Sequence, residues 1–147
     1  MPWLFCYGSN HPAQLAERLG RGDWDLRSGR LDDYWRVFRG YSQRWGGGVA
    51  SLAPKPGQSV YGYVARVSAP DLALMDKYEG VAGGAYERMM VQVETPSGDV
   101  SAVAYVSTSR ERAAPTRAYL EAVSKTIGAF WRGSGGGPVK WSDVTVR

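Results

Sequence analysis

Residues 5–11, FCYGSNH, join an apolar run to a cluster of small polar residues near the start of the chain. The run that opens this stretch, residues 2–7, is mostly apolar and rich in aromatics, which predicts a short buried strand. Asn10 is a common helix N-cap, and Leu15 and Leu19 after it are spaced to share one helical face. The stretch therefore predicts a strand, a tight turn and a helix in direct succession.

The turn over residues 7–10 also has the features of an anion-binding site. Gly8 lets the backbone turn tightly and lets a ligand approach it closely. Free backbone amides at a helix N-terminus, at the positive end of its dipole, favour a negatively charged oxygen. A plain strand-to-helix turn is the alternative interpretation.

Strand patterns dominate the rest of the chain. We expect strands at residues 27–41, 45–54 (after a glycine turn), 59–67, 85–94, 100–108 and 139–146. Turns are predicted at 54–57 (PKPG), 95–99 (TPSGD) and 133–138 (GSGGGP). The turn at 95–99 predicts a hairpin between its flanking strands.

Two further helices are predicted. The first spans residues 68–80, where Ser68 and Asp71 form a variant capping box and Gly80 can end the helix. The second, residues 115–131, has apolar or aromatic side chains every four positions. Together these elements predict an α+β fold with a strongly curved or barrel-like sheet and flanking helices.

Composition limits the function classes. The chain has 147 residues, 44% of them hydrophobic, which fits a single domain over residues 1–147. Its formal net charge is +4, but arginines and acids alternate, so a solvated surface or a mildly anionic substrate explains the charge better than nucleic-acid binding. Neither a signal peptide nor a membrane-spanning run is recognisable, so we expect no membrane partner.

The chain has one histidine and one cysteine, His11 and Cys6. They cannot supply a zinc site based on histidine, and they poorly support Ser-His-Asp or Cys-His catalysis. A single cysteine forms no internal disulfide, which suits the cytoplasm. We expect Cys6 to be a packed strand residue and His11 an exposed residue in the first turn of its helix.

Glu79 ends an otherwise apolar helical face beside Met75, Tyr78 and Val81. Partial burial there would raise the pKa of its carboxyl group and let it exchange protons near neutral pH. A solvated helix end is the alternative. Glu87 is a rival acid, although an exposed strand end is expected for it.

Five short motifs follow one another in a characteristic order. They are Tyr7-Gly8-Ser9-Asn10, WGGGVAS at 45–51, VYGYV at 60–64, YEGV at 78–81 with Tyr86 seven residues after Glu79, and AYV at 104–106. In this order they resemble the gamma-glutamylcyclotransferase-like family, over roughly residues 3–131. The resemblance implies that family's AIG2-like fold, a small mixed barrel with flanking helices.

The resemblance also implies a reaction. The α-amine of an L-γ-glutamyl amide or amino acid would attack its own γ-carbonyl, which releases 5-oxoproline and the free amine. This intramolecular aminolysis is an acyl transfer or lyase-type cyclisation that needs no cofactor and no metal. Its partner would be the small γ-glutamyl substrate, with no role for nucleic acid.

The resemblance further implies roles for single residues. Glu79 matches the family's acid/base glutamate. The substrate-binding positions of the family match Tyr7, Gly8, Ser9, Asn10, Tyr86 and Tyr105. His11 departs from the apolar residue that usually follows the turn, which leaves the substrate preference open. A non-catalytic ligand-binding or interaction module on the same fold is the alternative function.

Overall fold

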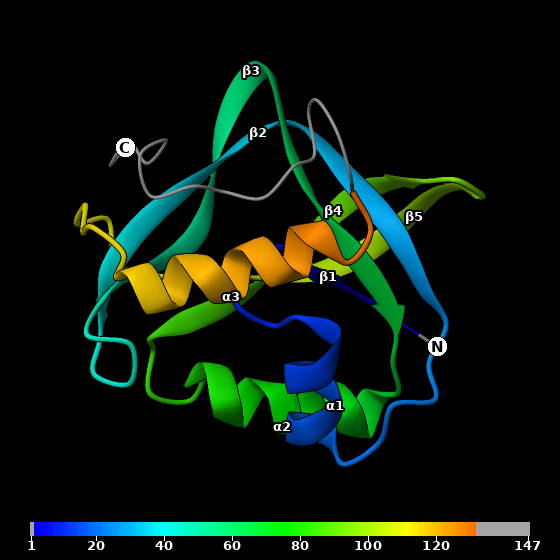
Figure 1. The fold of residues 1–147 in the computed structure, drawn as a ribbon, viewed down its shortest axis with the longest axis horizontal. Coiled ribbons are helices and arrows are strands. Elements are labelled where there is room, and N and C mark those ends of the chain that lie inside the picture. Colours follow the sequence, from blue (N-terminus) through cyan, green and yellow to red (C-terminus); the bar gives the residue numbers. More distant parts are fainter. Residues whose placement is uncertain (1, 132–147) are drawn as a thin grey trace.

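The structure, a computed structural model, describes residues 2–131, which form five strands and three helices (Figure 1). In chain order the elements are β1 (Trp3–Cys6), α1 (Pro12–Leu19), β2 (Leu26–Ser42), β3 (Gly47–Arg66), α2 (Ala69–Glu79), β4 (Tyr86–Thr95), β5 (Gly98–Ser107) and α3 (Arg117–Gly128). The predicted α+β class is confirmed.

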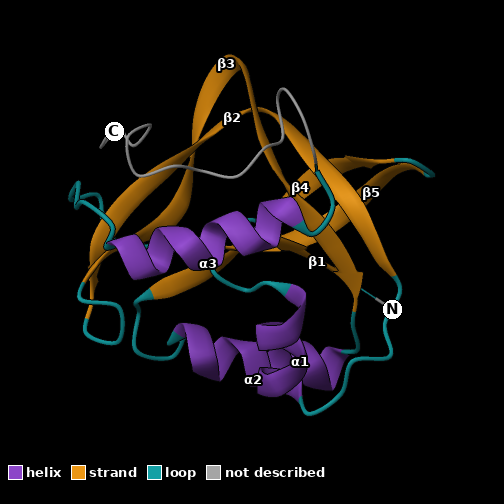
Figure 2. Cartoon of the chain, in the orientation of Figure 1, coloured by secondary structure: helices purple, strands orange, loops and turns teal. Residues whose placement is uncertain are grey.

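The strands close into a barrel in the order β1-β3-β2-β4-β5. Strand β1 makes the closure, because it pairs antiparallel with β3 and parallel with β5. Its first residue, Trp3, lies opposite Arg66 in one pair and Ala102 in the other. Helix α3 crosses one side of the barrel, whereas α1 and α2 pack together below it (Figure 2). The predicted barrel-like sheet is therefore confirmed.

Strand β1 separates two hydrophobic clusters, because alternate residues of a strand face opposite sides. Phe5 and the following Tyr7 belong to the cluster that includes the buried face of α3. Leu4 and Cys6 belong to the cluster that includes the buried residues of α1 and α2. The turn after β1 consequently begins at the boundary between the two clusters.

Helix α2 begins and ends where the sequence predicts. The Ser68 hydroxyl accepts a hydrogen bond from the Asp71 amide, and the Asp71 carboxylate accepts one from the Ser68 amide. This capping box satisfies two amides that the helix itself leaves free. Gly80 ends the helix in the left-handed region, with φ of 69°. Glu79 is thereby fixed as the last helical residue.

Helix α1 begins one residue later than predicted, since His11 and not Asn10 is its N-cap. Nδ1 of the half-buried His11 ring accepts a hydrogen bond from the Gln14 amide at 3.4 Å. The prediction of an exposed first-turn residue is therefore wrong. The Asn10 side chain instead bonds to Arg18 and Glu79, so contacts between distant residues replace its local capping role.

Residues 54–57 do not form the predicted turn between separate strands. They lie within β3, whose two halves both pair with β2. Pro54 lies opposite Tyr34 and Ser59 lies opposite Asp32, so β3 has more residues than β2 in this interval. The stretch is therefore a bulge in a long hairpin, and the glycine and proline residues bend the strand without reversing it.

The predicted β4–β5 hairpin and α3 are confirmed, although α3 is shorter than residues 115–131. Trp131 follows the helix, and its indole N–H donates a hydrogen bond to the Gly62 carbonyl at 2.8 Å. The predicted turn and final strand lie outside the described residues, at 133–138 and 139–146.

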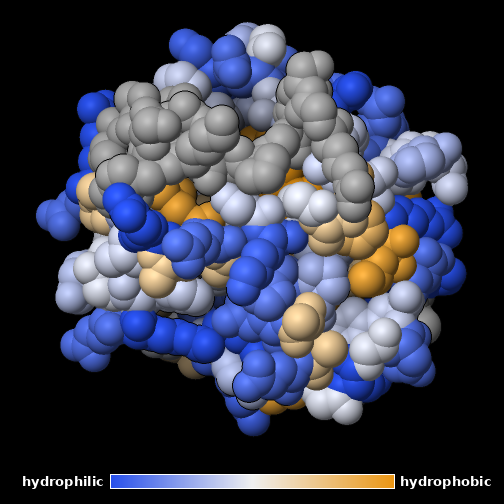
Figure 3. Space-filling view, in the orientation of Figure 1, coloured by the Kyte–Doolittle hydropathy of each residue, from blue (hydrophilic) through white to orange (hydrophobic). Residues whose placement is uncertain are grey.

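The face of the molecule that carries α3 is mainly hydrophilic, with small hydrophobic patches (Figure 3). Three large hydrophobic side chains are well exposed within residues 2–131, and two of them, Tyr41 and Tyr78, line the pocket described below. No helix in this part of the chain has the length and apolar character needed to cross a bilayer.

Candidate functional site

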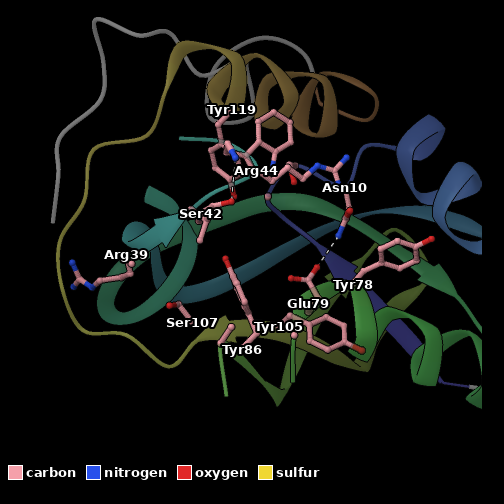
Figure 4. Close-up of a pocket in the computed structure, with 18 of the residues that line it drawn as sticks. Asn10, Arg39, Ser42, Arg44, Tyr78, Glu79, Tyr86, Tyr105, Ser107 and Tyr119 are labelled. Atoms are coloured by element: carbon pink, nitrogen blue, oxygen red, sulfur yellow. Dashed lines mark hydrogen bonds between the residues drawn. The ribbon is translucent and has the colours of Figure 1, made fainter. Parts of the chain in front are cut away.

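A cavity of about 420 Å³ lies where several segments meet. They include the turn after β1, the last residues of α2, the β2–β3 turn, the adjacent ends of β4 and β5, and the first turn of α3, which contributes Tyr119 (Figure 4). The volume falls in the range of about 300–1,000 Å³ that is usual for small-molecule sites. Glu79 and the whole Tyr7–Asn10 turn line it, so the structure brings together features that are about seventy residues apart in the sequence.

The Tyr7–Asn10 turn passes close to the base of α3. A Cβ atom at Gly8 would lie 3.2 Å from the Tyr119 hydroxyl, so a larger residue at this position would crowd that ring. Across residues 2–131, no hydrogen-bond acceptor is found for the backbone N–H groups of Gly8, Ser9 and Asn10. These amides precede α1 and border the cavity, which makes them available to a bound oxygen.

Glu79 belongs to a small polar network between α1, α2 and the turn. Asn10 Nδ2 donates a hydrogen bond to Glu79 Oε1 at 3.2 Å (Figure 4), and Arg18 Nη1 donates one to Asn10 Oδ1 at 2.8 Å. Arg18 Nη1 also lies 3.9 Å from Glu79 Oε1. Both contacts of Glu79 use one carboxylate oxygen, Oε1. The other, Oε2, has no hydrogen-bond partner in the described part of the chain.

The surroundings of Glu79 change its acidity. Its side chain is 15% exposed, and burial raises the pKa of the carboxyl group above its usual value. The Arg18 cation and the Asn10 amide act in the opposite direction and keep the rise smaller. The result is a carboxylate that can both lose and regain a proton closer to neutral pH than a solvated glutamate can.

The three tyrosines that the sequence singles out all line the cavity but use their hydroxyl groups differently. The Tyr7 hydroxyl donates to the Tyr105 carbonyl at 2.5 Å. The Tyr105 hydroxyl leaves the cavity and donates to Asp76 Oδ1 at 2.6 Å, because alternate residues of β5 face α2. The Tyr86 side chain points into the cavity (Figure 4), and its hydroxyl has no partner within residues 2–131.

Tyr86 is held as a neutral donor. Burial is the main reason why the pKa of its hydroxyl lies well above the usual tyrosine range, and the nearby Tyr119, Tyr7 and Glu79 raise it further. A hydroxyl group that stays protonated at neutral pH can donate a hydrogen bond to an oxygen of a ligand. Tyr86 is therefore the tyrosine whose polar end is free to meet one.

Arg18 is a site residue that sequence reasoning missed. It lies three residues after the buried Leu15, so it shares the inward face of α1, and its side chain is only 10% exposed. An arginine on the apolar face of a short amphipathic helix is the signal that points to a buried partner. Its guanidinium also lies over the Tyr78 ring, 5.2 Å from the ring centre.

The alternative candidates are less suited to the chemistry, although Cys6 also lines the cavity. Cys6 is buried, and burial raises the pKa of its thiol to about 12, which leaves it a poor nucleophile. Glu87 is exposed on β4 and lies outside the cavity wall. Among the described residues, no three His, Cys, Asp or Glu side chains are grouped so that they could hold a metal ion.

Comparisons with known proteins point to one family. The model of the AIG2-like family matches residues 59–129. Curated proteins called gamma-glutamylcyclotransferase, from Homo sapiens and Mus musculus, are 34% and 31% identical to this chain over alignments that cover 81% of it. In sequence the chain is therefore similar to the gamma-glutamylcyclotransferase-like family. The same alignments cover 66% of each relative, so the chain spans just under two thirds of these relatives' length.

Solved structures extend the match to most of the chain. A gamma-glutamyl cyclotransferase superposes with a TM-score of 0.79 at 25% identity and covers 97% of this chain and 95% of its own. An uncharacterized Homo sapiens protein gives a TM-score of 0.78, also at 25% identity, over 96% of this chain and 94% of its own. YkqA from Bacillus subtilis gives a TM-score of 0.77 at 20% identity, over 89% of this chain and 49% of its own. At this identity the match shows a common fold and nothing more.

Proposed function

We propose that this chain cyclises L-γ-glutamyl amides or γ-glutamyl amino acids to 5-oxoproline and a free amine, with Glu79 as the catalytic acid and base. One observation carries the proposal: Glu79 is shielded from water in the cavity, with one oxygen held by Asn10 and the other open. The curated relatives are called gamma-glutamylcyclotransferase, which supports the same reaction for this chain.

The substrate supplies its own nucleophile in this reaction. Attack of the α-amine on the γ-carbonyl closes a five-membered ring, so the protein has to fold the substrate rather than bring two molecules together. Well-oriented intramolecular reactions gain up to about 7–11 kcal/mol relative to separate reactants. A site with one buried cysteine and a histidine that serves as a helix cap is compatible with this chemistry, because no protein nucleophile takes part.

Glu79 performs two proton transfers. Its open oxygen, Oε2, first takes a proton from the substrate ammonium, and the resulting amine forms the new C–N bond to the γ-carbon. The tetrahedral intermediate then collapses, and the bond to the leaving nitrogen breaks while Glu79 returns the proton to that nitrogen. The ring nitrogen gives its second proton to the released amine, so the products are the neutral lactam and an ammonium ion. Burial supports both steps, since it raises the pKa of Glu79 toward neutrality. Asn10 and Arg18 keep the carboxylate oriented.

Oxygen atoms of the substrate also need donors. We assign this role to the unpartnered amides of Gly8, Ser9 and Asn10 and to the free Tyr86 hydroxyl. Donors fixed before the reaction stabilise a developing oxyanion without a cost of reorganisation. The α-carboxylate of the γ-glutamyl group is the second oxygen anion that this turn can bind. Tyr7 and Tyr105 contribute to the cavity wall through groups other than their hydroxyls, which are engaged elsewhere.

The reaction needs neither a metal nor an organic cofactor. Proton transfer, ring closure and loss of the amine are all carried by the substrate, one carboxylate and fixed donors. We therefore expect the rate to be unchanged after exhaustive dialysis against a chelator, and activity restored only by an added divalent metal would contradict the mechanism. A cytoplasmic location is part of the same proposal and rests on the single cysteine, which is a free thiol.

The proposal is tested by mass-spectrometric detection of 5-oxoproline with a panel of L-γ-glutamyl amines and amino acids. An α-linked glutamyl isomer is the matched control, because its amide lies on the α-carboxyl group, where attack by the α-amine would close a three-membered ring and cannot release the amine with 5-oxoproline. A second control replaces the γ-glutamyl group with a 4-aminobutanoyl group, which lacks the α-carboxylate and would give 2-pyrrolidinone. We expect product from the γ-linked compounds and neither lactam from the controls. Binding of γ-glutamyl compounds without 5-oxoproline would favour the non-catalytic alternative.

A further inference from the structure

The cavity carries more positive than negative charge. The charged side chains that line it are one carboxylate, Glu79, and three guanidinium groups, Arg18, Arg39 and Arg44. Arg18 lies beside Glu79 and compensates it. Arg39 and Arg44 form no ion pair with any acid in residues 2–131, so the cavity keeps two uncompensated positive charges.

Four arginines outside the cavity are ion-paired with acids on the surface: Arg21, Arg27, Arg30 and Arg88. Other arginines that form no ion pair within residues 2–131, such as Arg110 and Arg112, are exposed to solvent. Arg39 and Arg44 differ from these because they line the cavity. A guanidinium group that faces a partly enclosed space without an acid attracts an anion from solution.

Arg44 is placed by the β2–β3 turn. Its guanidinium lies 5.7 Å from the centre of the Trp45 ring, and that ring meets the Tyr119 ring edge-on at 5.2 Å. The Trp45 amide donates to the Ser42 hydroxyl at 3.2 Å, and the Trp45 carbonyl accepts a hydrogen bond from Thr116 at 3.0 Å. Arg44 is thus carried on a turn that is bonded to α3, which restricts where its charge can lie.

Arg39 marks the opposite end of the cavity. Figure 4 shows it beyond Ser42 and Ser107, on the side away from Glu79. Its Nη1 atom is buried and lacks a hydrogen-bond partner among the described residues. Burial, followed by the neighbouring charges of Arg112 and Arg110, lowers the pKa of Arg39. An anion near this guanidinium would supply the missing partner and relieve the repulsion.

We propose that Arg44 and Arg39 are specificity-determining residues that select γ-glutamyl compounds whose leaving amine is itself acidic, with a carboxylate beyond that of an ordinary amino acid. The inference rests on the proposed function. The two uncompensated guanidinium groups match the two carboxylates of a leaving glutamate or aspartate. A single acidic amino acid and a γ-linked chain of glutamates share this chemistry, whereas a polyamine would place its cations against both arginines.

The test compares two substrates that differ in one charge, L-γ-glutamyl-L-glutamate and L-γ-glutamyl-L-glutamine. Binding is measured by titration calorimetry on the Glu79→Gln protein, and KM is measured on the protein with Glu79 intact. We expect the acidic dipeptide to bind about tenfold more tightly, as one charge-assisted contact allows. γ-Linked triglutamate distinguishes a longer chain from a single acidic residue, because it adds charge beyond the second position.

Substitution then assigns the preference to residues. Arg44→Gln should weaken binding of the glutamate dipeptide about tenfold more than binding of the glutamine dipeptide, and Arg39→Gln should have the same selective effect, somewhat smaller. Arg44→Lys should retain most of the preference because it keeps the charge. Arg27→Gln is the matched control, since Arg27 pairs with Asp25 outside the cavity.

Equal affinity for the two dipeptides would overturn the proposal. A preference for the acidic dipeptide that survives in both Arg44→Gln and Arg39→Gln would overturn it too. These outcomes are separate from those that test the proposed function. Selective binding without 5-oxoproline from any substrate would leave the arginine site in place and refute the reaction. Release of 5-oxoproline without any preference for the acidic dipeptide would support the reaction and refute the arginine site.

Discussion

The two ends of helix α2 each carry a carboxylate that faces an arginine of the α1 region, yet the two pairs differ. At the beginning, Asp71 lies 2.5 Å from Arg21, and its carboxylate also accepts the Ser68 amide. At the end, Glu79 lies 3.9 Å from Arg18, and one of its oxygens is open to the cavity. The first carboxylate accepts hydrogen bonds from a cation and from a backbone amide, both on Oδ2, and lies outside the cavity wall, whereas the second accepts only the Asn10 amide and faces the cavity.

The pKa values move in opposite directions as a result. Burial alone would raise the pKa of Asp71, but the hydrogen bonds from Arg21 and Ser68 outweigh it, so that pKa lies below its usual value. Burial also dominates at Glu79, and there the weaker contacts with Arg18 and Asn10 do not reverse it. One helix therefore holds an acid that stays charged and an acid that can exchange a proton. The first stabilises the helix, and the second is suited to catalysis.

The largest expected effect follows from removing the exchangeable acid. Glu79→Gln keeps the size of the side chain and one hydrogen bond, but it cannot carry a proton. We expect kcat for the best γ-glutamyl substrate to fall by about 10²–10⁴, the usual contribution of general acid–base catalysis, with binding largely retained. A steady-state assay of 5-oxoproline measures the fall. Glu87→Gln is the matched control and should give rates near those of the unaltered protein, and a loss below tenfold for Glu79→Gln would exclude it as the proton carrier.

A smaller effect is expected when the partner of Glu79 is removed. The Arg18 cation lowers the pKa of Glu79, so Arg18→Gln raises that pKa, and the basic form is reached only at higher pH. The acidic limb of the kcat/KM profile should therefore move to higher pH, with a loss at neutral pH of about tenfold, or about 1.4 kcal/mol. Arg21→Gln should leave the position of the limb unaltered. A lower rate with an unshifted limb would mean that Arg18 acts without affecting the acidity of Glu79.

The smallest effect is expected at the N-terminus of α2, where Ser68 caps the helix. Ser68→Ala removes the hydroxyl group that caps α2, which should lower the free energy of unfolding by about 1 kcal/mol. The expected change appears in urea unfolding, while kcat and KM stay as they were because Ser68 lies outside the cavity wall. A lower kcat at unaltered stability would show that the two ends of α2 are not separate in function.

Local signals in the sequence were sufficient for the elements that depend on neighbouring residues. The α2 caps, the β4–β5 hairpin and the barrel-like sheet follow from turn residues and alternation within short windows. The prediction failed where contacts between residues far apart in the sequence determine the structure. Asn10 is a good N-cap by type, but Glu79 and Arg18 engage its side chain and His11 takes the cap.

Residues of the candidate site could be named from the sequence, but their geometry could not. The turn and Glu79 could be named from motifs, whereas their meeting in one cavity depends on closure of the barrel by β1. Periodicity also cannot tell which tyrosine hydroxyl is free. Tyr105 donates to Asp76 on α2, while Tyr86 has its hydroxyl in the cavity, and this difference arises from the faces of two adjacent strands.

The central claim is that Glu79 exchanges a proton near neutral pH while Asp71 does not. The direct measurement is a carboxyl ¹³C NMR titration of protein labelled at Asp and Glu, with the two signals assigned through Glu79→Gln and Asp71→Asn. We expect a midpoint for Glu79 above the usual glutamate range, matched by the acidic limb of kcat/KM, and a midpoint for Asp71 below the usual aspartate range. A Glu79 midpoint at or below that of a solvated glutamate would contradict it.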